Sequence, residues 1–170
     1  MWIASRVPSG YNIRMRSTRI LAALIATVAL TTAPAAQQRR PADPVVEVFK
    51  TSTCGCCSKW IDHLKSAGFN VSFIDMPQTE LDKLKAKRGV PASVHSCHTA
   101  LLGRYVLEGH IPASEVKRLL REKPDVVGIA VPGMPPGSPG MEVADRDLPT
   151  YNVLSFDKQG KTRVFSTQKP

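Results

Sequence analysis

The chain has 170 residues and a formal net charge of +9, from 23 Lys and Arg against 14 Asp and Glu. This length fits one domain with a single hydrophobic core. The basic residues are dispersed and do not alternate with aromatic residues, which argues against a nucleic-acid partner. The one tight basic group, Lys83, Lys85, Lys87 and Arg88, is expected to form a solvated helix face.

The N-terminal segment has the features of a secretory signal peptide. Translation starts at Met1 or Met15; after Met15 come a basic stretch and an apolar run of 11 residues, 20–30. Residues 33–35, Ala-Pro-Ala, supply a cleavage site. A membrane anchor is the alternative, but a bilayer core needs about 20 apolar residues. We therefore predict removal of residues 1–35 on export, without stable membrane insertion, which lowers the formal charge to +5.

Hydrophobic periodicity predicts alternating strands and helices after a flexible linker at residues 36–44. Trp60, Ile61 and Leu64 recur at helical spacing, and Thr79 resembles the first residue of a capping box. In chain order we expect a strand at 45–50, a helix between Thr53 and Gly68, a strand at 70–76, a helix from Thr79 to Gly89, strands at 99–102 and 104–108 around the Gly103 turn, a helix at 111–123 that begins with Pro112 in its first turn, and a strand at 126–131.

The order β-α-β-α-β-β-α is that of the thioredoxin fold, so we predict an α/β, thioredoxin-like core at residues 45–131. Beyond it, residues 131–141 hold four prolines and three glycines and cannot form regular structure. Residues 151–156 and 161–166, joined by a turn, predict a terminal β-hairpin. The Pro/Gly-rich loop and this hairpin make up a second part of the chain, residues 132–170.

Three of the four cysteines, Cys54, Cys56 and Cys57, fall within four positions between the first strand and the first helix. Cys54 and Cys57 alone form the C-x-x-C spacing of thioredoxin-like redox sites, where a helix N-terminus stabilises a thiolate. The third thiol, Cys56, would compete with that pair in a dithiol–disulfide cycle. Closely spaced thiolates suit Cu(I), which prefers sulfur donors and can be bridged into a cluster. The cysteines therefore predict a soft-metal site.

The fourth cysteine, Cys97, falls in the loop that faces the C-x-x-C motif in the predicted fold. Counting back from the Gly103 turn, Cys97 stands just before the third core strand, where redox enzymes of this fold carry a cis-proline. Pro91 is a rival for that position, but it would leave Cys97 about 20 Å away, at about 3.3 Å per residue of strand. We therefore expect Cys97, with His98 beside it as a ligand or supporting donor, to complete a four-sulfur site.

Further candidate ligands follow from the same topology. The end of the fourth strand returns to the sulfurs, so His110 is a candidate ligand, or alternatively a cap of the next helix. Met134 and Met141 flank the Pro/Gly-rich loop, and their thioethers are candidate ligands, although loop packing would also account for them. We expect His63 to be exposed and His95 to be structural.

Five motifs in order resemble the CopG type of cysteine-rich periplasmic copper-resistance proteins: TCGCC, SCHTA, GRYVLEGH, GIAVPGMPPGSPGM and YNVLSFDKQG. The resemblance covers about residues 45–166. It implies a thioredoxin-like domain that binds copper through the thiolates of its four cysteines, with a part in handling Cu(I) and Cu(II). It extends more loosely to His98, Met134 and Met141.

The sequence thus predicts an exported, periplasmic copper-binding protein that works with other periplasmic copper-handling proteins, rather than an enzyme. The alternative is a periplasmic thiol–disulfide oxidoreductase that uses Cys54 and Cys57. Two structural disulfides are a third interpretation, but neighbours such as Cys56 and Cys57 cannot readily bridge each other. Zinc also accepts Cys and His ligands, although structural zinc sites usually draw them from two separated pairs.

Overall fold

The computed structural model describes residues 44–144 and 147–170, which fall within one compact unit, Arg39–Pro170. The predicted signal peptide, and the predicted linker up to residue 43, lie outside the described residues. Within the described ranges, no helix is long and apolar enough to cross a membrane.

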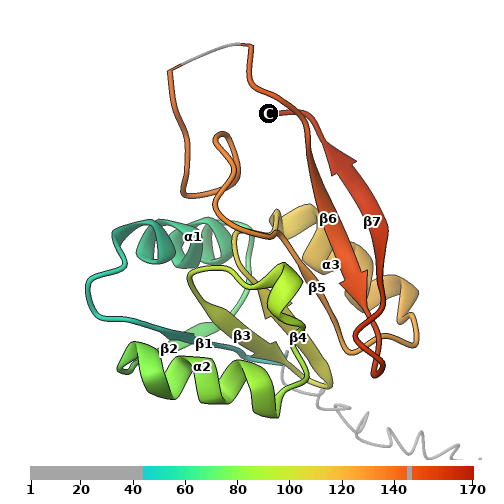
Figure 1. Ribbon diagram of the computed structural model, residues 1–170. Coiled ribbons are helices and arrows are strands. Elements are labelled where there is room, and N and C mark those ends of the chain that lie inside the picture. The colour runs from blue at the N-terminus through green and yellow to red at the C-terminus, as the bar shows by residue number, and fades with distance from the viewer. Residues whose placement is uncertain (1–43, 145–146) are drawn as a thin grey trace, which may run out of the picture. The chain divides into compact units, whose positions relative to one another are not determined.

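Strands and helices alternate along the first part of the chain, and a hairpin follows (Figure 1). The elements are β1 (Val46–Lys50), α1 (Gly55–Ser66), β2 (Val71–Asp75), α2 (Gln78–Lys87), a 3₁₀ turn η1 (Ala92–Val94), β3 (Thr99–Leu102), β4 (Tyr105–Glu108), α3 (Ala113–Glu122), β5 (Gly128–Ala130), β6 (Tyr151–Phe156) and β7 (Thr162–Gln168). The predicted α/β class is confirmed, and the order through α3 is the predicted β-α-β-α-β-β-α. The assignment to the thioredoxin-like group stays a prediction.

The strands of the described residues form one seven-stranded sheet, in the order β2-β1-β3-β4-β5-β6-β7. β1 and β2 are parallel across the α1 crossover, as are β4 and β5 across α3. β3 is antiparallel to β1 and to β4, which it meets across the Gly103 turn. The hairpin β6–β7 pairs with β5 and therefore continues the sheet of the core.

Alternation along the strands divides the buried apolar side chains between two faces of the sheet. On one face, residues of α1 and α3, among them Trp60 and Val116, pack on β1, β3, β4 and β5. A smaller core on the other face joins Val90, Val94 and Phe156. Figure 1 shows α1 and α2 on opposite sides of the sheet. β1, which leads to the first cysteines, therefore lies between α1 and α2.

Two helices begin differently from the sequence-based expectation. Pro77 is the N-cap of α2, and Asp82 accepts a hydrogen bond from Gln78 rather than from a backbone N–H. The predicted capping box at Thr79 is therefore wrong, because the helix already begins before Thr79. Likewise Pro112 is the N-cap of α3 and lies outside its first turn.

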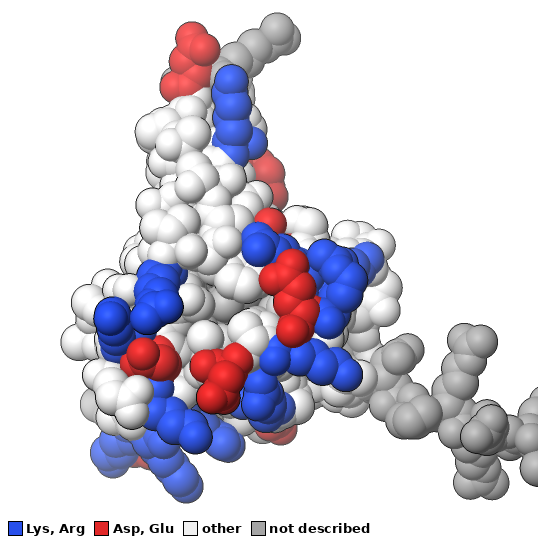
Figure 2. Space-filling model, turned by 90° about the vertical axis from the view of Figure 1, so that its right-hand side faces the viewer, with Lys and Arg blue, Asp and Glu red and all other residues white. Residues whose placement is uncertain are grey.

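Charged side chains are mixed on the surface. Figure 2 shows Asp and Glu side chains lying among the Lys and Arg side chains of the face it presents. On α3, for example, Arg118 forms ion pairs with Glu115 and Glu122, at 3.7 and 2.8 Å. This mixture is what the dispersed charges of the sequence indicate.

Candidate metal centre

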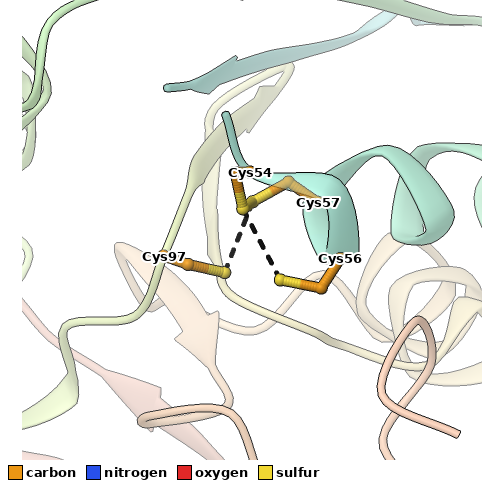
Figure 3. A group of neighbouring side chains, drawn as sticks. All are labelled: Cys54, Cys56, Cys57 and Cys97. Carbon is orange, nitrogen blue, oxygen red and sulfur yellow. Dashed lines mark hydrogen bonds between the residues drawn. A yellow bond between two sulfur atoms is a disulfide. The ribbon is translucent and has the colours of Figure 1, made fainter. Parts of the chain in front are cut away.

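The register of the sheet brings two loops together at one end of the molecule's central strands. Phe49, near the end of β1, pairs with Thr99 at the start of β3. Cys54 follows β1 as the N-cap of α1, and Cys97 precedes β3, so the two cysteine-bearing loops meet. All four cysteine sulfurs lie within 4.8 Å of one another, three from α1 and its cap and one from the opposite loop (Figure 3).

Two of these sulfurs are joined to each other. Cys54 and Cys57 form a disulfide, whereas Cys56 and Cys97 are free thiols. Cys56 Sγ lies 3.6 Å from Cys54 Sγ, and Cys97 Sγ lies 3.5 Å from Cys57 Sγ (Figure 3). Cys57 is buried, and the other three are partly exposed. The pair with C-x-x-C spacing is thus oxidised, and each of its sulfurs has a free thiol beside it.

Cys97 also belongs to a second group of close donors, with His98 and His110. His110 Nε2 lies 2.9 Å from Cys97 Sγ, and His98 Nδ1 lies 3.4 Å from the same sulfur. His110 Nδ1 lies 2.7 Å from the carbonyl oxygen of Pro139, which can only accept, so Nδ1 carries a proton and donates it. In neutral His110, Nε2 is therefore the unprotonated nitrogen, and it faces Cys97.

His98 is fully buried beside two other rings. Its centroid lies 4.3 Å from that of Trp60 and 5.1 Å from that of His110. Its Nε2 is buried and has no hydrogen-bond partner among the described residues. Burial lowers the pKa of His98 well below 6.5, and the charges of His110 and Lys85 lower it further. His98 is thus held neutral, with Nδ1 toward the sulfurs.

Burial also shifts the pKa values of the two groups that face each other, the Cys97 thiol and the His110 imidazole. Burial first, and then the neighbouring Cys56, raise the pKa of the Cys97 thiol to about 12. Burial lowers the pKa of His110, and its hydrogen bond to Pro139 opposes that shift. At neutral pH Cys97 is therefore a protonated thiol. It becomes a ligand when a metal ion displaces its proton, and a nucleophile when a base removes that proton.

The Pro/Gly-rich loop folds against the start of α1. Met134 Sδ lies 3.9 Å from Cys56 Sγ. Gly140 has φ +89°, and a Cβ there would lie 2.7 Å from the carbonyl oxygen of Cys56 and 3.0 Å from the backbone nitrogen of Trp60. Met141 is joined to the loop by backbone hydrogen bonds. Among the contacts of the described residues, the loop brings Met134 to the sulfurs and does not bring Met141.

A buried ion pair supports the loop that carries Cys97. The side chains of Lys85 on α2 and Glu108 on β4 are 1% and 0% exposed and form this pair. Glu108 also accepts hydrogen bonds from the backbone N–H of Ser96, at 2.7 Å, and from the hydroxyl of Thr99, at 2.6 Å. Burial raises the pKa of Glu108, and Lys85 opposes that shift. The expectation that Lys85 is solvated is therefore wrong, because this side of α2 packs against the sheet.

Two other residues support the site in ways that the sequence analysis did not predict. Trp60 donates its indole N–H to the Ile111 carbonyl, at 2.8 Å, and also packs on His98. Its position three residues after Cys57, on the same helix face, was the available signal. His63 was expected to be exposed; it is partly buried, and its Nε2 accepts a hydrogen bond from the backbone N–H that begins α3, at 3.0 Å. His95 lies against the backbone after α2, in the structural place expected.

This arrangement offers sulfur and imidazole donors from one end of the sheet. Thiolates and thioethers are the ligands that Cu(I) prefers, and imidazole also accepts Cu(II) and Zn²⁺. All four thiolates become available when the Cys54–Cys57 disulfide is reduced. In the disulfide form, the free donors are Cys56, Cys97, the Met134 thioether and the two imidazoles, and the disulfide can undergo exchange with a thiol.

The fold and the site define a cysteine-rich α/β protein with a candidate metal centre. Residues 94–141 match a family model described as "Protein of unknown function, DUF411". Two solved structures, named as Form 1 and Form 2 of copper resistance protein copG, are similar to this chain, with TM-scores of 0.68 and 0.67 and 40% sequence identity each. Both matches cover 75% of this chain, and they cover 100% and 99% of the other chains. Comparison with curated proteins gave no significant match.

The identity and the coverage show that this chain belongs to the CopG family of copper resistance proteins. The resemblance indicated by the five sequence motifs is thereby confirmed. The segment matched by the family model contains Cys97, His98, His110 and both loop methionines. The ligand roles of these residues stay predictions.

Proposed function

We propose that this chain is an exported copper-binding protein that holds Cu(I) through its cysteine thiolates and acts in copper resistance or homeostasis. The observation that carries this proposal is the group of four cysteine sulfurs within 4.8 Å of one another. Sulfur donors favour Cu(I), and neighbouring thiolates can bridge several ions into a cluster. The similarity to two structures named as copper resistance protein points to the same metal.

The proposed copper site also includes a thioether and two imidazoles near the sulfurs. Met134 adds a thioether beside Cys56, and the imidazoles of His98 and His110 add nitrogen donors that give some access to Cu(II). The hydrogen bond from His110 to Pro139 orients the ring and directs its unprotonated nitrogen to the sulfurs, as supporting bonds do for metal-binding histidines. Binding through all four thiolates requires two electrons, which reduce the Cys54–Cys57 disulfide.

Export to the periplasm is part of the proposal. It is supported by the basic stretch, short apolar run and Ala-Pro-Ala segment within residues 1–35. N-terminal sequencing of protein from a periplasmic fraction is expected to begin at Ala36. Recovery of a chain that keeps residues 1–35 would contradict this part.

A second candidate function is thiol–disulfide oxidoreductase activity. The Cys54–Cys57 disulfide favours it, because this disulfide lies at the N-terminus of α1, where a released thiolate is stabilised. The two candidates differ in their need for Cys56. Exchange with a substrate disulfide uses Cys54 and Cys57, whereas a copper cluster uses every neighbouring thiolate.

The test is metal analysis of protein purified anaerobically in reduced form, with X-ray absorption at the copper edge. We expect bound copper with sulfur ligands, and a lower copper-to-protein ratio in Cys56→Ser. Ser58→Ala, a change on the same exposed turn, is the matched control and should bind as the unaltered chain does. Zinc in place of copper, or an unchanged copper ratio in Cys56→Ser together with full disulfide-exchange activity, would contradict the proposal and favour one of the alternatives.

A further inference from the structure

The two free thiols lie beside the two sulfurs of the disulfide, an arrangement that metal binding alone does not explain. Each sulfur of the Cys54–Cys57 disulfide has one free thiol sulfur within 3.6 Å: Cys56 beside Cys54, and Cys97 beside Cys57. Among the contacts of residues 44–144 and 147–170, only Cys97 of these two thiols has a base beside it, since His110 Nε2 lies 2.9 Å from Cys97 Sγ. A thiol next to both a disulfide sulfur and a proton acceptor has the partners that exchange requires.

We propose that Cys97 attacks the disulfide at Cys57, with His110 as the base, so that the disulfide moves within the chain from Cys54–Cys57 to Cys57–Cys97. This activity is independent of the proposed copper binding. It also differs from oxidoreductase activity on another protein, because both the nucleophile and the disulfide belong to this chain.

The step balances without an outside oxidant or reductant. Cys97 Sγ passes its proton to His110 Nε2 and forms a bond to Cys57 Sγ. The Cys54–Cys57 bond breaks, and its electron pair leaves on Cys54 Sγ as a thiolate. One disulfide is lost and one is formed, so the oxidation state of the chain is unchanged.

Burial, which raises the pKa of the Cys97 thiol to about 12 and lowers the pKa of His110, opposes the proton transfer between them and slows the step. Two contacts act in its favour, one at each end. The Pro139 carbonyl accepts a hydrogen bond from His110 Nδ1 and so holds the ring with its unprotonated nitrogen toward Cys97, as the third group of a nucleophile–base–orienter arrangement does. At the other end, the leaving sulfur belongs to the N-cap of α1, whose first turn contains no acidic residue. The partial positive charge of the helix N-terminus stabilises the Cys54 thiolate as it forms.

The exchange changes which thiols are free. Before it, the free thiols are Cys56 and Cys97; after it, they are Cys54 and Cys56, whose sulfurs lie 3.6 Å apart. Met134 Sδ lies 3.9 Å from Cys56, so the second arrangement places two thiols and a thioether side by side. The oxidised chain thus presents two alternative sets of sulfur donors.

Trypsin offers a direct test, because peptide 51–59 carries three cysteines and peptide 89–104 carries Cys97. The exported protein is reduced, and one equivalent of diamide then forms one disulfide per chain. After removal of the reagent, the protein is incubated without oxygen or metal, and samples are alkylated at intervals and digested.

We expect the amount of peptide 51–59 joined to peptide 89–104 to increase with time, while the amount of internally bridged peptide 51–59 decreases. The number of alkylated cysteines should stay at two per chain. Fragmentation should place the link at Cys57. No linked peptide, or a link through Cys54 or Cys56, would overturn the proposal.

The role of the base is tested by the rate of the same exchange. His110→Gln should slow it by about 10²-fold, the contribution expected of a general base. His95→Gln is the matched control: His95 lies in the same region against a backbone carbonyl, and its replacement should leave the rate unchanged. An equal rate in His110→Gln would overturn the role of His110. If circular dichroism shows that His110→Gln is unfolded, His110→Asn takes its place in this test. Whether the disulfide moves at all is decided by the unaltered chain.

Discussion

At the scale of single residues, Gly140 decides how closely the Pro/Gly-rich loop approaches the sulfurs. Its positive φ of +89° and the absence of a side chain let the loop pack against the carbonyl oxygen of Cys56. The preceding residue, Pro139, then accepts the hydrogen bond that orients His110. Gly140 thus allows the close packing of the loop whose Pro139 carbonyl sets the tautomer of His110.

Gly133 allows a matched comparison in the same loop. It also has a positive φ, +65°, but a Cβ there would meet nothing within 4 Å. We expect Gly133→Ala to lower the free energy of unfolding by about 1–2 kcal/mol, from backbone strain alone. Gly140→Ala should lower it by about 3 kcal/mol or more, because a steric clash is added to the strain. Urea denaturation measures both, and equal losses would contradict the close packing of the loop.

At the scale of elements, α2 contributes more than cover for one face of the sheet. Through Lys85 it reaches Glu108 on β4, and Glu108 in turn binds Ser96 and Thr99, which stand on either side of Cys97 and His98. A helix, a strand and the cysteine-bearing loop therefore share one buried polar network. The loop that carries Cys97 is thus held in part by two buried side chains on other elements, Lys85 and Glu108.

Lys85→Met should be strongly destabilising, because it leaves Glu108 buried without its charged partner. Removing one member of a buried pair typically costs about 3–5 kcal/mol. Lys83→Met is the control on the same helix: Lys83 is 73% exposed, and its ion pair with Glu80 is on the surface. We expect that change to stay within about 0.5 kcal/mol of the unaltered chain. Chemical denaturation of the two variants gives the comparison, and a small effect of Lys85→Met would show that the network is not needed.

At the scale of the whole molecule, much of the architecture could be predicted from the sequence. Apolar periodicity located the strands and helices, and the antiparallel β3–β4 pair across Gly103 made the position of Cys97 countable along the chain. The burial of Lys85 could not be predicted, since its partner Glu108 lies 23 residues away and its neighbours are also basic. The orientation of His110 could not be predicted either, because it depends on the path of a loop without regular structure.

The pH dependence of global stability follows from groups at both ends of α1. Burial lowers the pKa values of His63, His98 and His110 from their ordinary 6.5, so the folded chain keeps them neutral. Below that pH the unfolded chain binds more protons at these groups, and stability falls as the pH falls. Glu108 acts in the opposite direction, because its pKa is raised from 4.5 on folding. Three groups thus lower the stability as the pH falls, and one group raises it.

We therefore expect the free energy of unfolding to decrease between about pH 7 and pH 5. In the unaltered chain, a protonated His63 can no longer accept the hydrogen bond from Ala113 at the start of α3. His63→Leu has no such group to protonate, so its stability should decrease less steeply. Denaturation curves across this pH range provide the measurement. A stability that stays constant or rises toward pH 5 would contradict the assignment of neutral, buried histidines.

The four sulfurs differ in exposure, so the group has a buried side at Cys57 and a solvent-facing rim at Cys56. Cys57 is 0% exposed, whereas Met134, which lies against Cys56, is 48% exposed. Under the proposed function, a ligand arriving from solvent would therefore meet the rim at Cys56 before it could reach the buried Cys57. An ion held by these sulfurs would then exchange its ligands stepwise, from the rim inward.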